Sequence, residues 1–215
     1  MEMLGYIVET LPAIIVILNP FGAALIFVSL TMEDSRAELR QKSRRTTLTV
    51  VITLFVFMFL GQLIFNLFSI TLDAFRIAGG TLLFGMGMSM IKGKHPQSKI
   101  TDKERAEVVE QEDISIIPMG IPVLCGPGSI ATIMVFRSHA ENSFEIATLF
   151  VSVLLAGLFT YYVLKYSHIM VNKFGKTALR IISRIMGLLV VTMAVQFIIS
   201  GVTDVLTSSF PGLLL

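Results

Sequence analysis

Long apolar runs, separated by short polar segments, make up most of this chain. About 20 apolar residues of helix are needed to cross the hydrocarbon core of a bilayer. Six segments reach that length or nearly so, and the alternation typical of a membrane β-strand is absent. We therefore predict an all-α integral membrane protein with six transmembrane helices. They are expected at residues 4–30, 46–72, 73–91, 114–136, 146–164 and 185–203, with polar connections at 31–45, 92–113 and 165–180.

Composition agrees with a membrane protein and excludes other classes. Apolar residues form 54% of the chain and charged residues 15%, against about 45–50% and about 25% in a typical soluble domain. A soluble enzyme, a disordered protein and a disulfide scaffold are thereby excluded, and the single cysteine, Cys125, cannot form an intramolecular disulfide. The first ten residues contain neither Lys nor Arg, so we expect the first apolar run to be a retained helix rather than a signal peptide.

Basic residues gather in the three polar connections. Of the 17 Lys and Arg residues, five lie in residues 31–45, five in 92–113 and four in 165–180, whereas only Arg137 lies in a connection on the other side. Because cytoplasmic loops of membrane proteins carry an excess of Lys and Arg, we expect these three connections inside the cell and both termini in the periplasm. The net charge of +2 is too small to indicate a nucleic-acid partner, so no nucleic acid is expected.

The two halves of the chain carry matching motifs. Residues 19–22 (Asn-Pro-Phe-Gly) correspond to 126–129 (Gly-Pro-Gly-Ser) at an offset of 107, and residues 75–79 correspond to 183–187 at an offset of 108. A half with three helices crosses the membrane an odd number of times, so the second half enters from the opposite side. We therefore predict two inverted-topology repeats, a plan common among secondary transporters. The predicted domains are the first three-helix repeat at 1–91, a charged cytoplasmic linker at 92–113 and the second, inverted repeat at 114–215.

Each repeat has a proline near the middle of its first span. Asn is a strong N-cap and Pro is favoured at the first helical position, so Asn19-Pro20 predicts a new helix at mid-membrane, and Gly126-Pro127 does so with a weaker cap. A helix that starts there presents unpaired N–H groups and a positive dipole end to an anionic group such as a carboxylate. Ordinary proline kinks are the alternative. The residues expected to bind substrate are Asn19, Pro20, Gly22, Gly126, Pro127, Gly128 and Ser129.

Four segments resemble the MarC family of bacterial six-helix inner-membrane proteins. They are residues 19–22, 75–80 (Phe-Arg-Ile-Ala-Gly-Gly), 121–128 (Ile-Pro-Val-Leu-Cys-Gly-Pro-Gly) and 184–188 (Arg-Ile-Met-Gly-Leu), and the resemblance covers nearly the whole chain. It implies an integral inner-membrane protein with both termini outside. It also implies transport, because some members of the family are described as small neutral amino acid transporters. The family is named for an association with antibiotic resistance.

Further polar residues lie within or at the ends of the predicted spans. Arg76 and Arg184 occupy matching places in the two repeats and are predicted as paired gates, with snorkelling to the headgroups as the alternative. Gln62 and Gln196 are candidates for lining a transport path, or for hydrogen-bonding a neighbouring helix. Glycines are expected to mark close helix packing at positions 79, 80, 85, 87, 157 and 187.

Catalysis and cofactor binding have little support in the sequence. Ser129 lacks a base, since nothing places the helix-end histidine, His168, beside it. His95 and His139 belong to connections on opposite sides of the membrane, so they do not form a metal-ligand cluster. A nucleotide-binding motif is also absent. We therefore expect no enzyme activity, no cofactor and no metal.

The predicted function is secondary transport of small neutral amino acids such as alanine or glycine. The protein could be an exporter. The expected partners are the lipid bilayer and a small zwitterionic solute, whose carboxylate suits half-helix N-termini and whose ammonium group suits unwound carbonyls. The alternatives are an ion channel or exporter, and a non-transporting membrane protein that affects envelope stress or antibiotic tolerance. The sequence leaves open a homo-oligomer, the coupling ion and the direction of transport.

Overall fold

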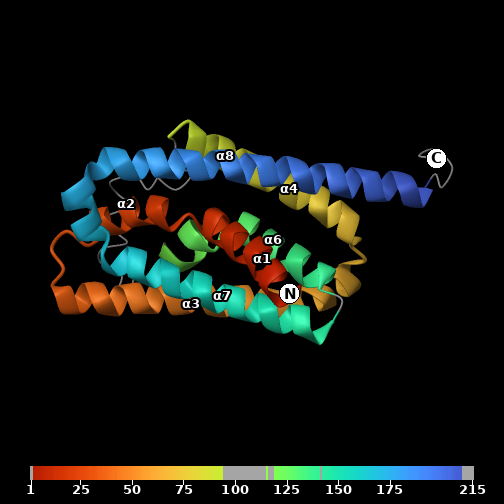
Figure 1. The fold of residues 1–215 in the computed structure, drawn as a ribbon, viewed down its shortest axis with the longest axis horizontal. Coiled ribbons are helices and arrows are strands. Elements are labelled where there is room, and N and C mark those ends of the chain that lie inside the picture. Colours follow the sequence, from red (N-terminus) through yellow and green to blue (C-terminus); the bar gives the residue numbers. More distant parts are fainter. Residues whose placement is uncertain (1, 94–114, 116–118, 141, 210–215) are drawn as a thin grey trace.

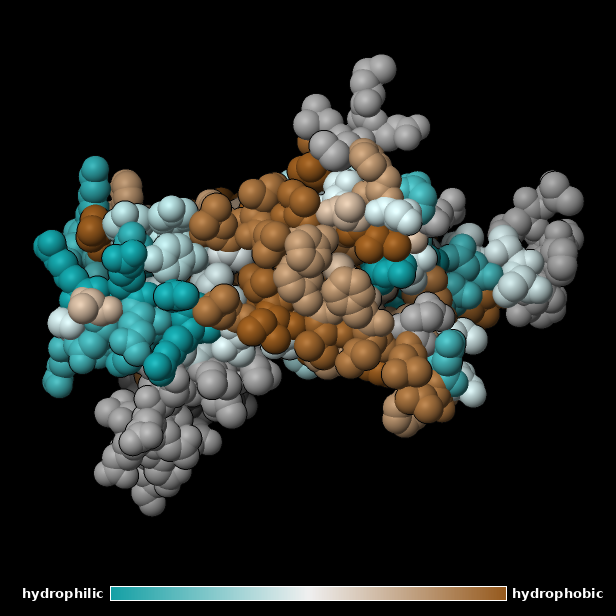
Figure 2. All heavy atoms as spheres, turned by 90° about the horizontal axis from the view of Figure 1, so that it is seen from below, coloured by the Kyte–Doolittle hydropathy of each residue, from teal (hydrophilic) through white to brown (hydrophobic). Residues whose placement is uncertain are grey.

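The structure of the protein is a computed structural model that describes residues 2–93, 115, 119–140 and 142–209. Every regular element within those residues is a helix, and the helices lie roughly along one axis (Figure 1). An apolar band covers the middle of the face seen in Figure 2, and hydrophilic residues gather at its left end. Figure 1 places the connections near residues 31–35 and 166 at that same end. This arrangement is that of a bundle of membrane-spanning helices.

The first predicted span is divided into two helices. α1 (Glu2–Leu18) continues through Pro12, and α2 (Pro20–Leu30) begins directly after Asn19. Asn19 has left-handed backbone angles (φ 44°, ψ 58°), which Asn adopts more readily than most residues. The break predicted from Asn19-Pro20 is therefore confirmed, whereas Pro12 alone does not interrupt the helix.

The second helix extends beyond its predicted span. α3 (Arg36–Phe68) starts at Arg36, although the apolar run starts only at residue 46. Ser35 and Glu38 form a capping box, in which Glu38 N–H donates to the Ser35 hydroxyl and Ser35 N–H donates to Glu38 Oε2 at 2.7 Å. The Arg, Lys and Gln residues that follow are good helix formers. The predicted polar connection at 31–45 is therefore largely helical, and α4 (Leu72–Ile91) then matches the third predicted span.

The predicted span at 114–136 is not one continuous helix. η1 (Met119–Leu124), a short π-helix, ends before Cys125, and α6 (Pro127–His139) follows Gly126. With 13 residues, α6 is about 20 Å long at 1.5 Å per residue. That length is shorter than the hydrocarbon core of a bilayer, about 30 Å. The break predicted at Gly126-Pro127 is thus confirmed.

The last two predicted spans lie in long helices. α7 (Ser143–Lys165) contains the fifth span and α8 (Ser167–Ser209) contains the sixth. Gly175, with φ 77° and ψ 159°, divides α8 into two helical stretches. The polar connection predicted at 165–180 is therefore itself mostly helical, because helix continues on both sides of Gly175.

Five helical segments of the described residues are long and apolar enough to cross a membrane. The fourth predicted span is not among them, so the prediction of six spans is not confirmed. Residue 114, residues 116–118 and residues 94–113, which include most of the predicted linker, lie outside the described residues.

Two helix pairs enclose the broken helices. α4 packs along α8, and α3 packs along α7. α1 contacts α7 and α6, α2 contacts α8 and η1, and α6 contacts α3 and α4. The segment Gly5–Leu30 is the most buried of the five candidate spans, and α6 is buried along most of its length. Both helix breaks therefore lie between these helix pairs, with Pro20 and Gly126 buried and Pro127 exposed.

Glycines allow α4 to approach α8 closely. A Cβ on Gly80 would lie 2.8 Å from the Ala194 carbonyl oxygen, and one on Gly87 would lie 2.9 Å from the Gly187 carbonyl oxygen. Gly85 differs, because it is exposed and a Cβ there would meet nothing within 4 Å. Its prediction as a packing glycine is therefore wrong. The other predicted packing glycines, at positions 79, 157 and 187, are confined by neighbouring helices.

Candidate substrate site at the two helix breaks

Asn19 joins the first break to α8. Its Oδ1 accepts a hydrogen bond from Gly22 N–H at 3.2 Å, which caps the start of α2. Its Nδ2 donates to the hydroxyl of Ser183, a buried residue of α8, at 3.1 Å. A single amide side chain therefore holds the break in its left-handed conformation and attaches it to a distant helix.

The second break lacks such a side chain. Gly126 has an extended backbone (φ −74°, ψ 175°), and its carbonyl oxygen accepts from Ser129 N–H at 3.0 Å and from Ile130 N–H at 3.2 Å. The Ser129 hydroxyl donates back to the Leu124 carbonyl oxygen at 2.9 Å. Gly128 N–H, in the first turn of α6, has no hydrogen-bond acceptor within the described part of the chain. The start of α6 therefore keeps a free donor, as expected for an uncapped N-terminus.

Gly128 is also a point of close contact between α6 and α4. A Cβ at this position would lie 2.7 Å from Cδ2 of Leu83 and 3.4 Å from Cε of Met86. Only glycine therefore fits here without displacement of the Leu83 side chain. The close approach brings the backbone of the second break against α4.

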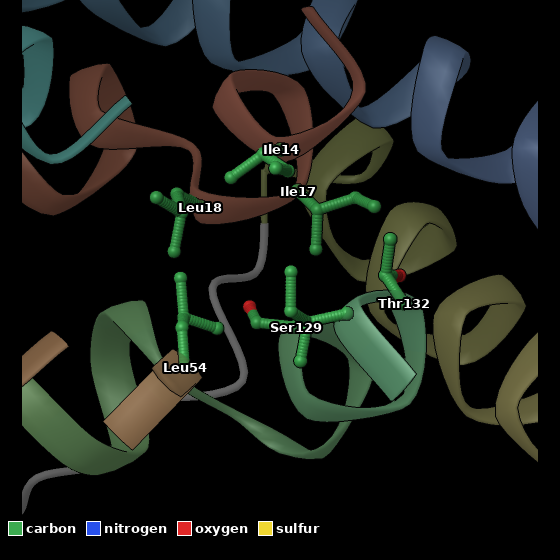
Figure 3. A pocket seen from close by; sticks show the side chains of 7 residues that line it. Ile14, Ile17, Leu18, Leu54, Ser129 and Thr132 are labelled. Carbon is green, nitrogen blue, oxygen red and sulfur yellow. The ribbon is translucent and has the colours of Figure 1, made fainter. Parts of the chain in front are cut away.

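A small cavity separates the two breaks (Figure 3). It has a volume of about 10 Å³, which is room for about one water molecule. The hydroxyls of Ser129 and Thr132 lie at its edge and donate to backbone carbonyls of their own segment, so their oxygens can still accept hydrogen bonds. A solute as large as an amino acid requires α1 and α6 to move apart. The lining residues are Ile14, Ile17 and Leu18 of α1, Leu54 of α3, and Ser129, Thr132 and Ile133 of α6.

A larger groove lies on the other side of the second break. It has a volume of about 500 Å³ and an almost wholly apolar lining, formed by α3, α4 and the chain around Gly126 and Pro127. Pro127 is exposed, so the groove opens to the surroundings of the bundle. The predicted substrate residues are therefore divided. Ser129 lines the cavity, Gly126 and Pro127 line the groove, and Asn19 and Gly22 contact each other at the first break.

Arg76 ties three helices together at the end opposite the basic segments. Its Nη1 forms an ion pair with Asp204 of α8 and lies 3.6 Å from Asp73 Oδ1 on its own helix. Its Nη2 contacts His139 Nε2 at the end of α6. Arg76 is 7% exposed, so it does not snorkel to the surface in this structure. We call Arg76, Asp73, Asp204 and His139 the outer cluster.

Arg184 lies in a different environment, although the sequence places it in the matching position. It is exposed, and its guanidinium lies beside Gly93, where a Cβ would approach Nη2 to 2.9 Å. Within the described residues it has no acidic partner. The two arginines are therefore not equivalent in this structure, and a gating role for either one stays a prediction.

The remaining path candidates do not line the cavity. Gln196 is exposed on α8, and its Nε2 donates to the Ser200 hydroxyl at 3.4 Å. The side chain of Gln62 lies outside the described part of the structure. Among the described residues there is also no group of three or more His, Cys, Asp or Glu side chains that could hold a metal.

Sequence reasoning missed the polar partners of the predicted residues. Ser183 directly precedes Arg184 in the repeated motif, so its place beside a helix break could have been tested from the motif. Asp204 is the first charged residue after the last apolar run, and that position indicated a polar contact at the end of the run. His139 was assigned to a connection, but it is the last residue of α6 and contacts Arg76.

The long apolar helices, the hydrophilic end and the buried helix breaks define a multi-pass α-helical membrane protein. The family model "MarC family integral membrane protein" matches residues 4–206, and the chain belongs to that family. The resemblance found in the sequence motifs is thereby confirmed.

Curated relatives share most of this length. The chain is similar to the UPF0056 membrane protein YhcE of Escherichia coli (33% identity, 92% of this chain and 90% of the relative). It is also similar to the UPF0056 membrane protein YvbG of Bacillus subtilis (34%, 96% and 100%) and to one from Pyrococcus abyssi (34%, 86% and 89%). These names specify a membrane protein and no activity. No solved structure matches the chain.

Proposed function

We propose that this protein is a secondary transporter of small neutral amino acids such as alanine or glycine. It would lie in the bacterial inner membrane with both termini in the periplasm. The observation that carries the proposal is that two interior helix breaks, after Leu18 and after Leu124, flank one small cavity at the centre of the bundle. Transporters commonly bind their solutes at paired, discontinuous helices of this kind.

The helix contacts favour an inverted repeat. α1 packs on α7, and its counterpart in the second half, η1, packs on α3. In the same way α2 packs on α8, and α6 packs on α4. Exchanging the two halves converts each of these contacts into the other. This correspondence supports two three-helix repeats, with residues 114–136 as the fourth, broken span.

The chemistry of the cavity suits a small zwitterion. α6 begins at Pro127, beside the cavity residue Ser129, so the positive end of its dipole would favour a carboxylate there. The hydroxyl oxygens of Ser129 and Thr132 can accept hydrogen bonds from an ammonium group. Ile17 and Leu18 would face a methyl side chain.

The two breaks differ in a way that suits alternating access. At the first break, Phe21 packs edge-on against Phe159 of α7, with ring centroids 5.9 Å apart. The residue that matches Phe21 in the second repeat is Gly128, and there the apolar groove stays open. In an inverted repeat, the opposite-facing state is obtained when the halves exchange conformations. That state would separate Phe21 from Phe159 and close the groove beside Pro127.

Exchange of labelled alanine across proteoliposomes tests this function. We expect saturable counterflow from the purified protein. Ion conductance without saturable exchange would identify a channel instead, and no flux of either kind would favour a non-transporting membrane protein.

Two serine variants on α6 locate the site. Ser129→Ala removes a hydroxyl at the cavity, so we expect the half-saturation concentration for alanine to rise about three- to tenfold, as for a lost hydrogen bond. Ser138→Ala is the matched control, because Ser138 donates to the Val135 carbonyl oxygen and does not line the cavity. Equal effects of the two variants would place the site elsewhere.

A further inference from the structure

One face of α8 carries polar side chains within its uncharged stretch. Thr192, Gln196 and Thr203 are exposed, and Ser200 is half-buried. Residues three and four positions apart lie on the same face of a helix, so these four side chains form a continuous line, which we call the polar stripe. Polar side chains on the surface of a membrane helix usually bond to another helix.

The polar stripe faces away from the rest of the chain. α8 buries Val190, Ala194 and Gly201, and all three lie on the side that packs against α4. At 3.6 residues per turn, Gln196 lies about 160° around the helix from Ala194. Figure 1 shows α8 along the edge of the bundle, with α4 crossing it and the remaining helices on one side of it. No helix of the described chain therefore reaches the polar stripe.

Gln196 has unused hydrogen-bonding groups. Its side chain carries two N–H donors and one acceptor oxygen. Within the described residues its one hydrogen bond runs from Nε2 to the Ser200 hydroxyl, and at 3.4 Å it is long. The second N–H and Oε1 are left without partners in the middle of an apolar stretch. Lipid chains cannot supply partners, so this arrangement is costly in a membrane.

We propose that the polar stripe of α8 is the interface of a homodimer. An amide is both donor and acceptor, so a second Gln196 at the same depth satisfies the first. Two copies inserted with the same topology are related by a twofold axis along the membrane normal, and this axis makes their α8 helices parallel and places identical residues opposite each other. The exposed side chains of Ile185, Leu189 and Ile199 flank the stripe and would pack around the amide pair.

Cysteine cross-linking in native membranes tests the position of the interface. In a Cys125→Ala background, which has no other cysteine, we expect Thr192→Cys and Ile199→Cys to form disulfide-linked dimers on mild oxidation. Leu154→Cys is the matched control, because Leu154 is 44% exposed on α7, away from the stripe. Equal cross-linking at position 154, or none at 192 and 199, would overturn the proposal.

Gln196→Leu tests the role of the amide. Since Gln196 is exposed, this variant keeps the monomer fold, which the thermal unfolding midpoint checks. We expect its association constant for dimerisation, measured by single-molecule photobleaching in liposomes, to fall about three- to tenfold. A loss of that size is expected for one interhelical hydrogen bond. An unchanged constant would overturn the proposal. So would rapid labelling of Gln196→Cys by a water-soluble maleimide, because that result would place position 196 beside water.

Discussion

Asn19 and Ser183 lie 164 residues apart in the sequence, and a 3.1 Å hydrogen bond from Asn19 Nδ2 to Ser183 Oγ joins them. The same Asn19 side chain caps α2 through Gly22 N–H. One residue therefore combines three roles: it adopts the left-handed backbone of the break, it starts the next helix, and it fixes both to α8. Three substitutions remove these roles in different combinations.

Asn19→Ala should lower the free energy of unfolding by about 3 kcal/mol, because it removes a cap worth about 1 kcal/mol and the bond to Ser183 worth about 0.6 kcal/mol, and it adds about 1–2 kcal/mol for a left-handed alanine. Asn19→Gly should cost less, since glycine adopts this conformation freely and is a fair N-cap. Ser183→Ala removes only the interhelical bond, worth about 0.6 kcal/mol. Unfolding of the three variants in detergent measures this order. If Asn19→Gly is as unstable as Asn19→Ala, the backbone conformation is not the cause.

Arg76→Lys should be nearly as harmful as Arg76→Ala. Separate nitrogens of the Arg76 guanidinium meet Asp204 and His139, and a single lysine ammonium cannot reach both. Asp204 is only partly buried, so we expect a loss of stability of about 1–3 kcal/mol, between the values for exposed and buried ion pairs. Thermal unfolding and the rate of alanine counterflow are the two measurements. Arg184→Lys is the control and should change neither, because Arg184 is exposed.

The fold was predictable where apolar length alone decides the structure. Apolar runs predicted the membrane-spanning parts of five helices, and Asn19-Pro20 and Gly126-Pro127 predicted both breaks from local capping chemistry. The helix bounds in the polar segments were less predictable. Arg and Lys favour helix, so α3 starts at Arg36, before the apolar run, and the basic residues of α8 lie in helix on both sides of Gly175.

Of the candidate site, the sequence predicted the positions of the two helix breaks but not the side chains that contact them. The residues that set the breaks are local, whereas Ser183, Asp204 and His139 reach their partners through tertiary packing over more than 60 residues. The motif match also predicted equal roles for Arg76 and Arg184. The structure makes them unequal, because acidic residues flank Arg76 on α4 and α8, while Arg184 has no acidic neighbour in the described part of the chain.

Topology can be tested with two exposed positions at opposite ends of the bundle. We expect Ser208→Cys to react with a membrane-impermeant maleimide in intact cells, and Glu33→Cys to react only after permeabilisation. Five spans separate these positions if the broken segment around Gly126 crosses the membrane, and four if it does not. Labelling of both positions from one side would therefore show that this segment does not cross. Reversed labelling would contradict the orientation inferred from the basic residues.

The outer cluster should make stability depend on pH. Burial, and then the positive charge of Arg76, lower the pKa of His139 below its ordinary value of 6.5, against weaker opposite effects of Glu9 and Asp204. As the pH falls below about 6.5, the unfolded chain binds a proton at this histidine before the folded chain does, so stability should decrease until the folded pKa is passed. Thermal unfolding measured between about pH 8 and about pH 5 should show this decrease. His139→Gln should show a smaller decrease, and an unchanged profile would assign the pH dependence to other groups.

Gly85→Ala and Gly87→Ala, two positions apart on α4, should have opposite effects on stability. A Cβ at Gly85 meets nothing within 4 Å, so the better helix propensity of alanine should stabilise the protein by up to about 1 kcal/mol. A Cβ at Gly87 would lie 2.9 Å from the Gly187 carbonyl oxygen, which is backbone and cannot turn aside, so α4 and α8 must separate at a cost of about 1–3 kcal/mol. Unfolding in detergent compares the two variants directly. Equal stabilities would mean that α4 and α8 do not pack as closely as Gly87 and Gly187 require.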